Sequence, residues 1–384
     1  MSKSVAFFSN QFAMTSGHGI ARYAKELYAG IRRLESEFNI VPVSTWSDRK
    51  GNDLNDFIES TGLNILPGGS KFLPLAWKYF NYPNVEQCLR SEVDLVHALS
   101  PGYPLATRKP YLVTVHDIGP LTHKQFFTKK DQWLMQASIK QAVRHADGII
   151  CVSHSTAKDL QNYVQDTYRE DLTDRIRVIH EGVDSDFGQP VKTIEIPDIH
   201  LIDELKGRPY LLTVGKISPR KNLDLVLNSF KDLTLKFPDH QLLTVGGDGW
   251  DFQQVKQRAG EYGIQKSVHF LGYVSDELLK HLYAHTEVFI YPSLFEGFGL
   301  TLLEAMACGA PVVTSNISSM PEIAGDAAIL IDPKNQHDLT DKLIQLLSDS
   351  TMKCYFREKG ISRASDFDWQ HTATKTLEFY NNII

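Results

Sequence analysis

The segment VFIYPSLFEGFGLTLLEAMACGAPVVTSN, residues 288–316, is the most informative stretch of this sequence. It begins and ends with short apolar runs rich in β-branched and aromatic residues, and a helix-like stretch follows Gly299 between them. A strand, a helix and a second strand in this order are typical of one βαβ unit of a parallel sheet. The same alternation continues along almost the whole chain, so we expect an α/β protein.

The strand-like runs form two series. They comprise residues 4–8, 39–44, 93–99, 111–117, 148–153 and 175–183 in the first half, and residues 210–215, 240–247, 267–274, 288–293, 310–316 and 328–333 in the second. Helical patterns lie near 19–34, 129–145 and 154–164. The first series stops at a proline-containing stretch of mixed polarity, residues 185–209, where we expect the linker. We therefore predict two doubly wound domains, residues 1–195 and 196–365.

Length and composition exclude several classes of protein. A chain of 384 residues exceeds what one hydrophobic core usually supports, and 42% hydrophobic with 22% charged residues is ordinary globular composition. The net charge of −6 gives no overall basic field for nucleic acid. Four distant cysteines argue against a disulfide framework or a structural zinc site. With no apolar run of 18 residues and no secretory signal, we expect a cytoplasmic protein.

Two carboxylates lie after the first strand of the opening segment. Doubly wound folds bind ligands at the carboxyl ends of their strands. Glu296 lies in the loop before the helix and Glu304 about two turns along it, so both can point into one cleft and hold a sugar and a ribose. The exposed amides of the helix start can meet phosphate, and they belong to Gly297, Phe298, Gly299 and Leu300. The alternative is two unrelated surface acids.

A cationic pair follows the first strand of the second series, in VGKISPRKNLDLVL, residues 214–227. Gly215 ends the strand, and Arg220 and Lys221 adjoin a helix that starts near Asn222. Two cations at a helix N-terminus form an anion site suited to a pyrophosphate, whose charge they would neutralise as it departs. The alternative is solvated surface charge.

Two post-strand segments of the first half are further candidates. His116 and Asp117 lie at a carboxyl edge, where a histidine can donate to a sugar hydroxyl or shuttle a proton, or simply pack beneath the loop. Gly17 and Gly19 precede an amphipathic helix and form either a diphosphate cradle or a tight turn. The full GxGxxG spacing is missing, which disfavours a nicotinamide cofactor.

Taken together, these segments resemble retaining glycosyltransferases of the GT-B fold, in the large group of mannosyl- and glucosyltransferases similar to glycosyltransferase family 4. The resemblance covers essentially the whole chain and rests on SGHGIARY, VTVHD, VSHSTAKDL, HEGVD, VGKISPRKNLDLVL, VGGDG, FLGYVSDELL, the opening segment and SDFDW. It implies two Rossmann-like domains facing a central cleft. The turn at Asp368 and Trp369 would lead residues 366–384 back to the first domain.

The resemblance also implies roles for single residues. Arg220 and Lys221 would bind the donor diphosphate with the amides around Gly19, Glu296 the donor sugar and Glu304 the ribose. His116 corresponds to a histidine near the donor sugar, and Val274 to a backbone contact with the base. The structural alternatives given above for each segment remain open. The predicted catalytic residues are His116, Arg220, Lys221 and Glu296. The predicted donor-binding residues are Gly17, Gly19, Gly215, Val274, Gly297, Phe298, Gly299, Leu300 and Glu304.

The reaction implied by the family retains the anomeric configuration. Retaining glycosidases place a carboxylate nucleophile behind the sugar, and here Asp117 is only a weak candidate for that place. Front-face displacement, in which the departing diphosphate helps to deprotonate the acceptor, is favoured. The DxD of Asp184, Ser185 and Asp186 matches a structural Gly-Val-Asp turn, so we predict no metal and no cofactor beyond the nucleotide-sugar co-substrate.

Donor and acceptor are predicted less sharply. GIARYAKEL, VHDIGPLTH and SPRKNLDLVL look most like users of GDP-mannose in O-antigen or capsule assembly, and UDP-glucose, UDP-galactose and UDP-N-acetylglucosamine remain alternatives. Residues 71–83 and 122–133 interleave aromatics with lysines, which suits sugar stacking, a lipid-linked saccharide acceptor at the inner face of the membrane, or ordinary core packing. A nucleotide-sugar 2-epimerase and a non-catalytic binding module are less favoured functions.

Overall fold

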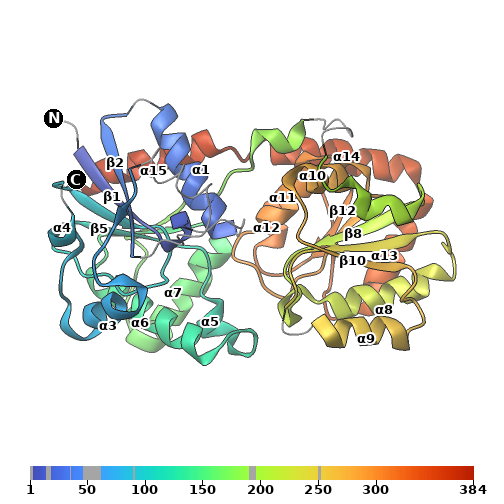
Figure 1. The fold of residues 1–384 in the computed structure, drawn as a ribbon, viewed down its shortest axis with the longest axis horizontal. Coiled ribbons are helices and arrows are strands. Elements are labelled where there is room, and N and C mark those ends of the chain that lie inside the picture. Colours follow the sequence, from blue (N-terminus) through green and yellow to red (C-terminus); the bar gives the residue numbers. More distant parts are fainter. Residues whose placement is uncertain are drawn as a thin grey trace. The chain divides into compact units, whose positions relative to one another are not determined.

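The computed structural model describes residues 3–13, 19–34, 36–45, 62–89, 91–189, 196–249 and 252–384. The chain forms two compact units, which are described separately (Figure 1). The first comprises Met1–Gly182 together with Trp369–Ile384, and the second Val183–Asp368.

The first unit is built on a seven-stranded parallel sheet in the order β3-β2-β1-β4-β5-β6-β7. Its strands are β1 Lys3–Phe8, β2 Phe38–Ser44, β3 Asn64–Ile65, β4 Leu95–Ala98, β5 Tyr111–Val115, β6 Gly148–Cys151 and β7 Ile176–Val178. Every residue of β4, β5 and β6 is buried, as expected for parallel strands that helices cover on both faces.

The α-helices of the first unit are α1 Gly19–Arg33, α3 Gly69–Phe80, α4 Val85–Cys88, α5 Gly119–Thr122, α6 Lys129–His145, α7 His154–Tyr168 and α15 Trp369–Ile383. Local sequence sets where they begin: the Thr128 hydroxyl accepts from the Asp131 amide in a capping box at the start of α6. The last helix, α15, packs against α1, and its Ala373 and Tyr380 belong to the same buried cluster as β1.

The second unit holds a six-stranded parallel sheet in the order β10-β9-β8-β11-β12-β13. Its strands are β8 Tyr210–Val214, β9 Gln241–Val245, β10 Val268–Gly272, β11 Val288–Tyr291, β12 Val312–Ser315 and β13 Ile329–Ile331. Its α-helices are α8 Leu223–Thr234, α9 Phe252–Glu261, α10 Asp276–His285, α11 Leu300–Ala307, α12 Met320–Ala324, α13 Gln336–Ser348 and α14 Ser350–Ala364. Short 3₁₀ turns occupy Ser185–Gly188, Ile199–Leu205 and Pro219–Lys221.

The first crossing between the units lies earlier in the chain than the boundary at 195 expected from the sequence. It falls between Gly182 and Val183, because Val183 already pairs with the second unit: its amide donates to the Phe367 carbonyl at 3.0 Å. Nearby, the thiol of Cys308, which follows the last residue of α11, donates to the Phe187 carbonyl. The chain returns to the first unit between Asp368 and Trp369, whereas the sequence predicted a returning segment from residue 366.

Among the described residues, no helix combines the length and the apolar character that crossing a bilayer requires.

Candidate functional site

The candidate site of the second unit lies where the strand order reverses. β8 and β11 are neighbours in the sheet, but the chain winds away from them in opposite directions, and doubly wound sheets bind their ligands at such a position. Asn222 ends the first loop in the left-handed region, with φ of 57°. Its side-chain amide donates to the carbonyls of Pro292, at 3.2 Å, and Pro333, at 2.8 Å, which holds the loops after β8, β11 and β13 together.

Three charged side chains meet in the loops after β8 and β11. Lys221 Nζ lies 2.7 Å from Glu296 Oε1, and the Arg220 guanidinium pairs with the other carboxylate oxygen. Arg220 Nη1 also donates to the Phe295 carbonyl at 2.8 Å. The structure therefore brings together the cationic pair and the first carboxylate of the sequence prediction, although 75 residues separate them.

Lys221 is positioned by two residues besides Glu296. Its Nζ donates to the Tyr291 hydroxyl at 2.6 Å and lies 4.4 Å from the centre of that ring. The aliphatic part of the side chain crosses over Gly215, where an added Cβ would stand 2.9 Å from Lys221 Cε. Gly215 has φ of 143°, so this position requires glycine both for its backbone and for the approach of the lysine.

The pKa values of the cluster reflect burial and mutual pairing. Burial alone would raise the pKa of Glu296, but Arg220 and Lys221 outweigh it and lower that pKa to about 2. Burial, with a smaller contribution from the nearby Arg220, lowers the pKa of Lys221 to about 8 against the opposing effect of Glu296. At neutral pH the cluster carries two positive charges and one negative charge, an excess that suits an anion.

The loop that carries Glu296 is fixed through its backbone. Ser318 Oγ accepts from the Glu296 amide at 3.1 Å and donates to its carbonyl at 2.6 Å, and Ser319 Oγ donates to the carbonyl of Phe298 at 2.7 Å. Gly299, with φ of 110°, is the N-cap of α11. This glycine turns the chain sharply enough for the helix N-terminus to follow the loop directly.

The other predicted donor-binding residues of this unit lie in or beside these loops. Gly297, Phe298 and Leu300 flank the start of α11. Glu304 is buried in α11, just over one turn from its start rather than two, and its carboxylate acts on the pKa of Lys221. Val274 lies in the loop between β10 and α10.

In the first unit, His116 follows β5 and is held from both sides. Its Nδ1 lies 2.8 Å from Glu181 Oε1, and its Nε2 lies 2.9 Å from the Leu99 carbonyl oxygen. Both partners are acceptors when the carboxylate is ionised, so this arrangement favours the imidazolium form, in which both ring nitrogens donate. Burial opposes this charge, but Glu181 and Leu99 raise the pKa of His116. Since both ring nitrogens already have these contacts, the predicted donation to a sugar hydroxyl would require one of them to change its partner.

A second buried histidine, His97, lies close by, and its pKa is shifted in the opposite direction to that of His116. His97 Nδ1 contacts the Tyr380 hydroxyl at 2.6 Å and Nε2 the Thr114 hydroxyl at 2.8 Å. Burial lowers the pKa of His97 to about 3, so this ring is neutral. Tyr23 contacts Thr114 at 3.1 Å and the edge of the His116 ring, which joins the two histidines into one network.

The remaining sequence candidates lie outside these clusters. Gly19 begins α1, with open space where a side chain would project, while Gly17 lies outside the described residues. Asp117 accepts from the Gly119 amide at 2.8 Å and so stabilises the turn into α5. Asp184 accepts from the Asp186 amide at 3.0 Å, as expected for a structural turn.

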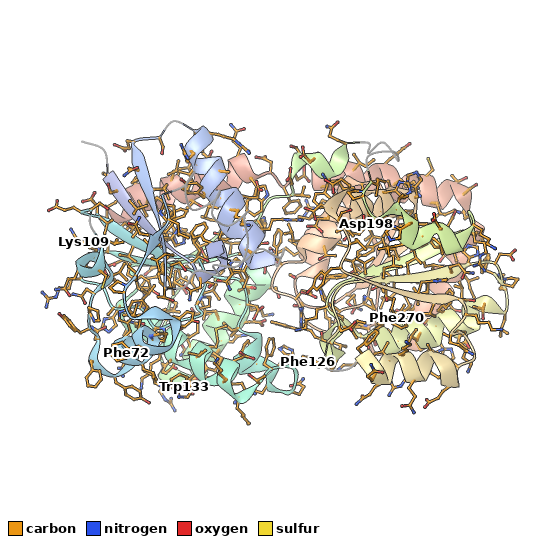
Figure 2. All side chains as sticks on the ribbon, in the orientation of Figure 1. Phe72, Lys109, Phe126, Trp133, Asp198 and Phe270 are labelled. Atoms are coloured by element: carbon orange, nitrogen blue, oxygen red, sulfur yellow. The ribbon has the colours of Figure 1, made fainter. Side chains whose placement is uncertain are left out.

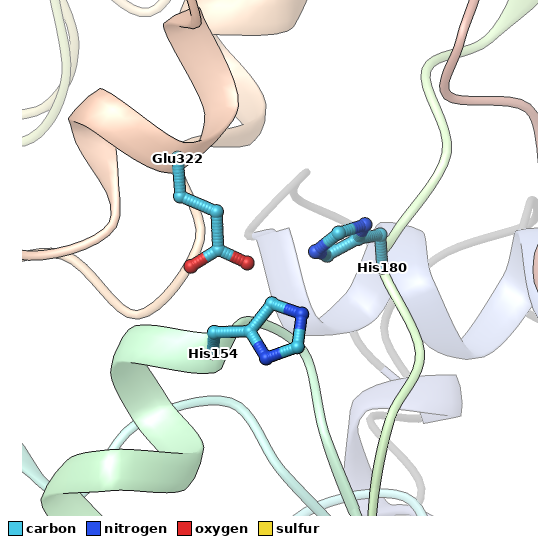
Figure 3. Close-up of side chains that lie close together, drawn as sticks. All are labelled: His154, His180 and Glu322. Atoms are coloured by element: carbon cyan, nitrogen blue, oxygen red, sulfur yellow. The ribbon is translucent and has the colours of Figure 1, made fainter.

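His154 and His180 received no role from the sequence, and the structure places them together. Their ring centres are 6.0 Å apart in an edge-to-face arrangement (Figure 3). His154 begins α7, and the backbone carbonyl of His180 accepts from the Thr372 hydroxyl of α15 at 2.8 Å.

Sequence reasoning missed the residues that position the charged groups, namely Tyr291, Ser318, Ser319 and Glu181. Tyr291 was within reach of a sequence argument, because it ends β11 at the carboxyl edge of the sheet. The two serines and Glu181 follow other strands, and only the folded structure shows which charged residue each one contacts.

Two family models match most of this chain. The model of the family described as Glycosyltransferase Family 4 matches residues 17–187, and that of Glycosyl transferases group 1 matches residues 196–363. The chain is 31% identical over 301 residues to O-antigen chain mannosyltransferase B of Escherichia coli, covering 76% of this chain and 75% of the relative. It is 28% identical over 280 residues to the serotype-specific mannosyltransferase WbdA of Escherichia coli, covering 70% of this chain and 33% of that longer protein.

Solved structures show the same architecture. The Anabaena protein Alr3699/HepE, crystallised with UDP and glucose, superposes with a TM-score of 0.77 at 18% identity, covering 99% of this chain and 100% of that one. At this identity the likeness bears on the fold alone. Two parallel-sheet Rossmann-like units, the two family matches and the mannosyltransferase relatives identify the chain as a glycosyltransferase of the GT-B fold that belongs to the glycosyltransferase family 4-like group.

Proposed function

We propose that this glycosyltransferase moves mannose from GDP-mannose onto a hydroxyl of a glycan or lipid-linked saccharide in O-antigen-type polysaccharide assembly, with retention of configuration. The proposal rests on the cluster of Arg220, Lys221 and Glu296, which lies between β8 and β11, where the strand order of the second sheet reverses. The choice of mannose is supported by the names of the relatives, an O-antigen chain mannosyltransferase and WbdA.

The cluster suggests how the site works. Arg220 and Lys221 are held by one carboxylate before the donor arrives, and the donor diphosphate would compete with that carboxylate for the two cations. Glu296 would then be released toward the hydroxyls of the sugar. Glu304, buried in α11, would accept from the ribose hydroxyls.

The two cations that would bind the donor would also assist the transfer of the sugar to the acceptor. The bond between the anomeric carbon and the diphosphate oxygen breaks while the acceptor oxygen bonds to that carbon on the same face. The acceptor proton passes to the departing diphosphate, and the charge that develops there is stabilised by Arg220 and Lys221. The proposed reaction needs no metal ion and no further cofactor.

A donor panel tests the proposal without an acceptor. Thermal shift and calorimetry with GDP-mannose, UDP-glucose, UDP-N-acetylglucosamine, GDP and UDP, each with and without EDTA, report binding to the native state. We expect shifts with GDP-mannose and GDP that EDTA does not change. Shifts with the uridine nucleotides alone would replace the donor, and loss of the shift in EDTA would contradict the metal-independent reaction.

Site variants test the roles. Glu296→Ala should abolish transfer and Lys221→Ala should weaken binding of GDP, whereas Asp366→Asn, an exposed acid of the same unit, should leave both unchanged. Wild-type turnover in Glu296→Ala would contradict the site. The anomeric configuration of the product, read by NMR, tests retention.

A further inference from the structure

Tyr291 is a buried neighbour of the charged cluster to which the proposed transfer reaction gives no role. It is the last residue of β11 and is only 2% exposed, at the edge of the sheet where Lys221 and Glu296 meet. Side chains fill the space between the sheet and the helices of the second unit, so a ring at this place is enclosed (Figure 2). A buried hydroxyl beside a ligand site calls for a physical explanation.

The backbone and the ring of Tyr291 are both fixed by neighbouring strands. Its carbonyl accepts from the Thr314 hydroxyl of β12 at 2.8 Å. Its ring stacks with Phe289, two residues earlier on the same side of β11, with ring centres 5.7 Å apart and planes at 22°. A side chain fixed in this way can hold a flexible partner at a defined place.

Lys221 is such a flexible partner, with four methylene groups and three N–H donors. Its Nζ donates to the Tyr291 hydroxyl at 2.6 Å and to Glu296 Oε1 at 2.7 Å. It also lies 4.4 Å from the centre of the Tyr291 ring. The hydroxyl oxygen and the face of the ring therefore both stabilise the charge of the ammonium group.

The two contacts of Lys221 differ in how a donor would affect them. Burial and the nearby Glu296 raise the pKa of Tyr291 well above its ordinary value, so the hydroxyl keeps its proton and accepts from Lys221 through a lone pair. Glu296 is an ionised carboxylate, which the hydroxyls of a sugar can draw toward themselves. The contact with Tyr291 is therefore the one that can persist when the donor is bound.

We propose that Tyr291 is a positioning residue that holds Lys221 at the donor diphosphate once the donor sugar has drawn Glu296 away. This role rests on the proposed function, in which Glu296 binds the sugar. Tyr291 would keep one N–H of Lys221, and the N–H that Glu296 gives up would turn to the diphosphate. Tyr291 acts on the donor only through Lys221, so its effect should disappear when that lysine is absent.

A double-mutant cycle tests this dependence. Calorimetry measures the affinity for GDP of the wild type, Tyr291→Phe, Lys221→Met and the variant with both changes. Tyr291→Phe should bind GDP about tenfold more weakly, from the loss of one hydrogen bond to a charged group. In the Lys221→Met background, Tyr291→Phe should have no further effect on the affinity for GDP.

Tyr210→Phe is the matched control. Tyr210 is also a buried tyrosine of this sheet, and its hydroxyl donates to the Leu282 carbonyl at 3.0 Å. It begins β8, whereas Tyr291 ends the neighbouring parallel strand β11, so the two tyrosines lie at opposite edges of the sheet. Tyr210→Phe should bind GDP as the wild type does, and thermal unfolding of each variant confirms that it is folded.

The pH dependence of GDP binding gives a readout that loss of packing alone would not move. The charged groups that act on Lys221 are Glu296, Arg220 and Glu304, and burial lowers its pKa to about 8. Tyr291→Leu removes both the hydroxyl and the ring, which favour the ammonium form, so it should lower the pKa of Lys221 further. GDP affinity should therefore fall from a lower pH in Tyr291→Leu than in the wild type, with Tyr291→Phe, which keeps the ring, between them.

NMR titration of the Lys221 side chain in the ligand-free protein separates this role from the proposed function. We expect a lower pKa of Lys221 in Tyr291→Leu and an unchanged one in Tyr210→Phe. If the wild type binds GDP or UDP, an unchanged pKa of Lys221 in Tyr291→Leu, or an equal effect of Tyr291→Phe with and without Lys221, would overturn the role of Tyr291 alone. A wild type that binds neither nucleotide would overturn the proposed function, and the role of Tyr291 with it.

Discussion

Glu296 is the residue on which the charge balance of the second unit depends. Its carboxylate is shared by Arg220 and Lys221, and all three side chains are at least partly withdrawn from water. Removing one partner of such a group leaves the others without compensation, which is costly where solvent is excluded. This explains why the site should be sensitive to pH as well as to mutation.

Replacing Glu296 by glutamine should lower the free energy of unfolding at pH 7. In acid, the difference in free energy of unfolding between this variant and the wild type should become smaller. The pKa of Glu296 is lowered to about 2, so its stabilising effect is complete above the unfolded value near 4.5 and is lost as pH falls toward 2. The shift corresponds to about 3 kcal/mol. Urea unfolding of both proteins at pH 7 and pH 3 measures the change.

The control for that comparison is Asp366→Asn. Asp366 pairs with Arg363, but its side chain is 60% exposed, so its pair should contribute little to stability. A stability gap between Glu296→Gln and wild type that stays constant from pH 7 to pH 3 would contradict the ion cluster.

The second residue-scale prediction concerns Glu181 and His116. Glu181→Gln should lower the pKa of His116, because burial then acts without the opposing carboxylate. In the wild type the pair stabilises the fold below pH 6.5, and this contribution is lost as pH rises through the raised pKa. Histidine NMR titration measures the pKa directly. Glu170→Gln, which removes an exposed partner of Arg175, should leave it unchanged.

At the scale of elements, the loop after β8 depends on how closely Lys221 approaches Gly215. Gly215→Ala should weaken binding of GDP by tenfold or more, because its Cβ would displace the lysine and its φ is unfavourable for alanine. Gly207→Ala is the matched control: its φ is also positive, at 75°, but the space around it is open. Calorimetry measures the affinity of both variants for GDP. Equal affinities of Gly215→Ala and Gly207→Ala would show that Lys221 does not bind the diphosphate.

The elements themselves were largely predictable from the sequence. The helices expected at 19–34 and 129–145 end within a residue of α1 and α6, because apolar periodicity and end residues such as Thr128 are local signals. Helix α3 was missed, since Pro74 lies inside it and its outer face is as apolar as its inner face.

The site was predictable only in part, for a physical reason. The residues that follow strands could be named, because parallel strands bring their carboxyl ends to one edge. The sequence could not show which of these residues pair. The charge of Glu296 is neutralised by cations 75 and 76 residues earlier in the chain, and His116 is held by Glu181, 65 residues away. These contacts depend on side-chain packing across loops, which leaves no periodic pattern in the sequence.

At the scale of the whole molecule, α15 belongs to the first unit although it follows the entire second unit in sequence. Tyr380→Ala should remove a fully buried ring from the core around β1 and cost about 3–5 kcal/mol. Peptide-resolved hydrogen exchange should then show lost protection in β1, α1, β2 and β4, residues 3–8, 19–33, 38–44 and 95–98. Tyr355→Ala, at a half-exposed site on α14, should leave those peptides protected; no effect of Tyr380→Ala would contradict the docking of α15.

The position of α15 also sets the order of events during synthesis. When the ribosome has made β1 to β7, the first unit still lacks Trp369, Ala373 and Tyr380, so its core is open to solvent. It stays incomplete while some 186 further residues, Val183–Asp368, are translated and able to fold. The unit that is made first is therefore the one that is finished last, and during that interval it is the part of the nascent chain most in need of chaperones.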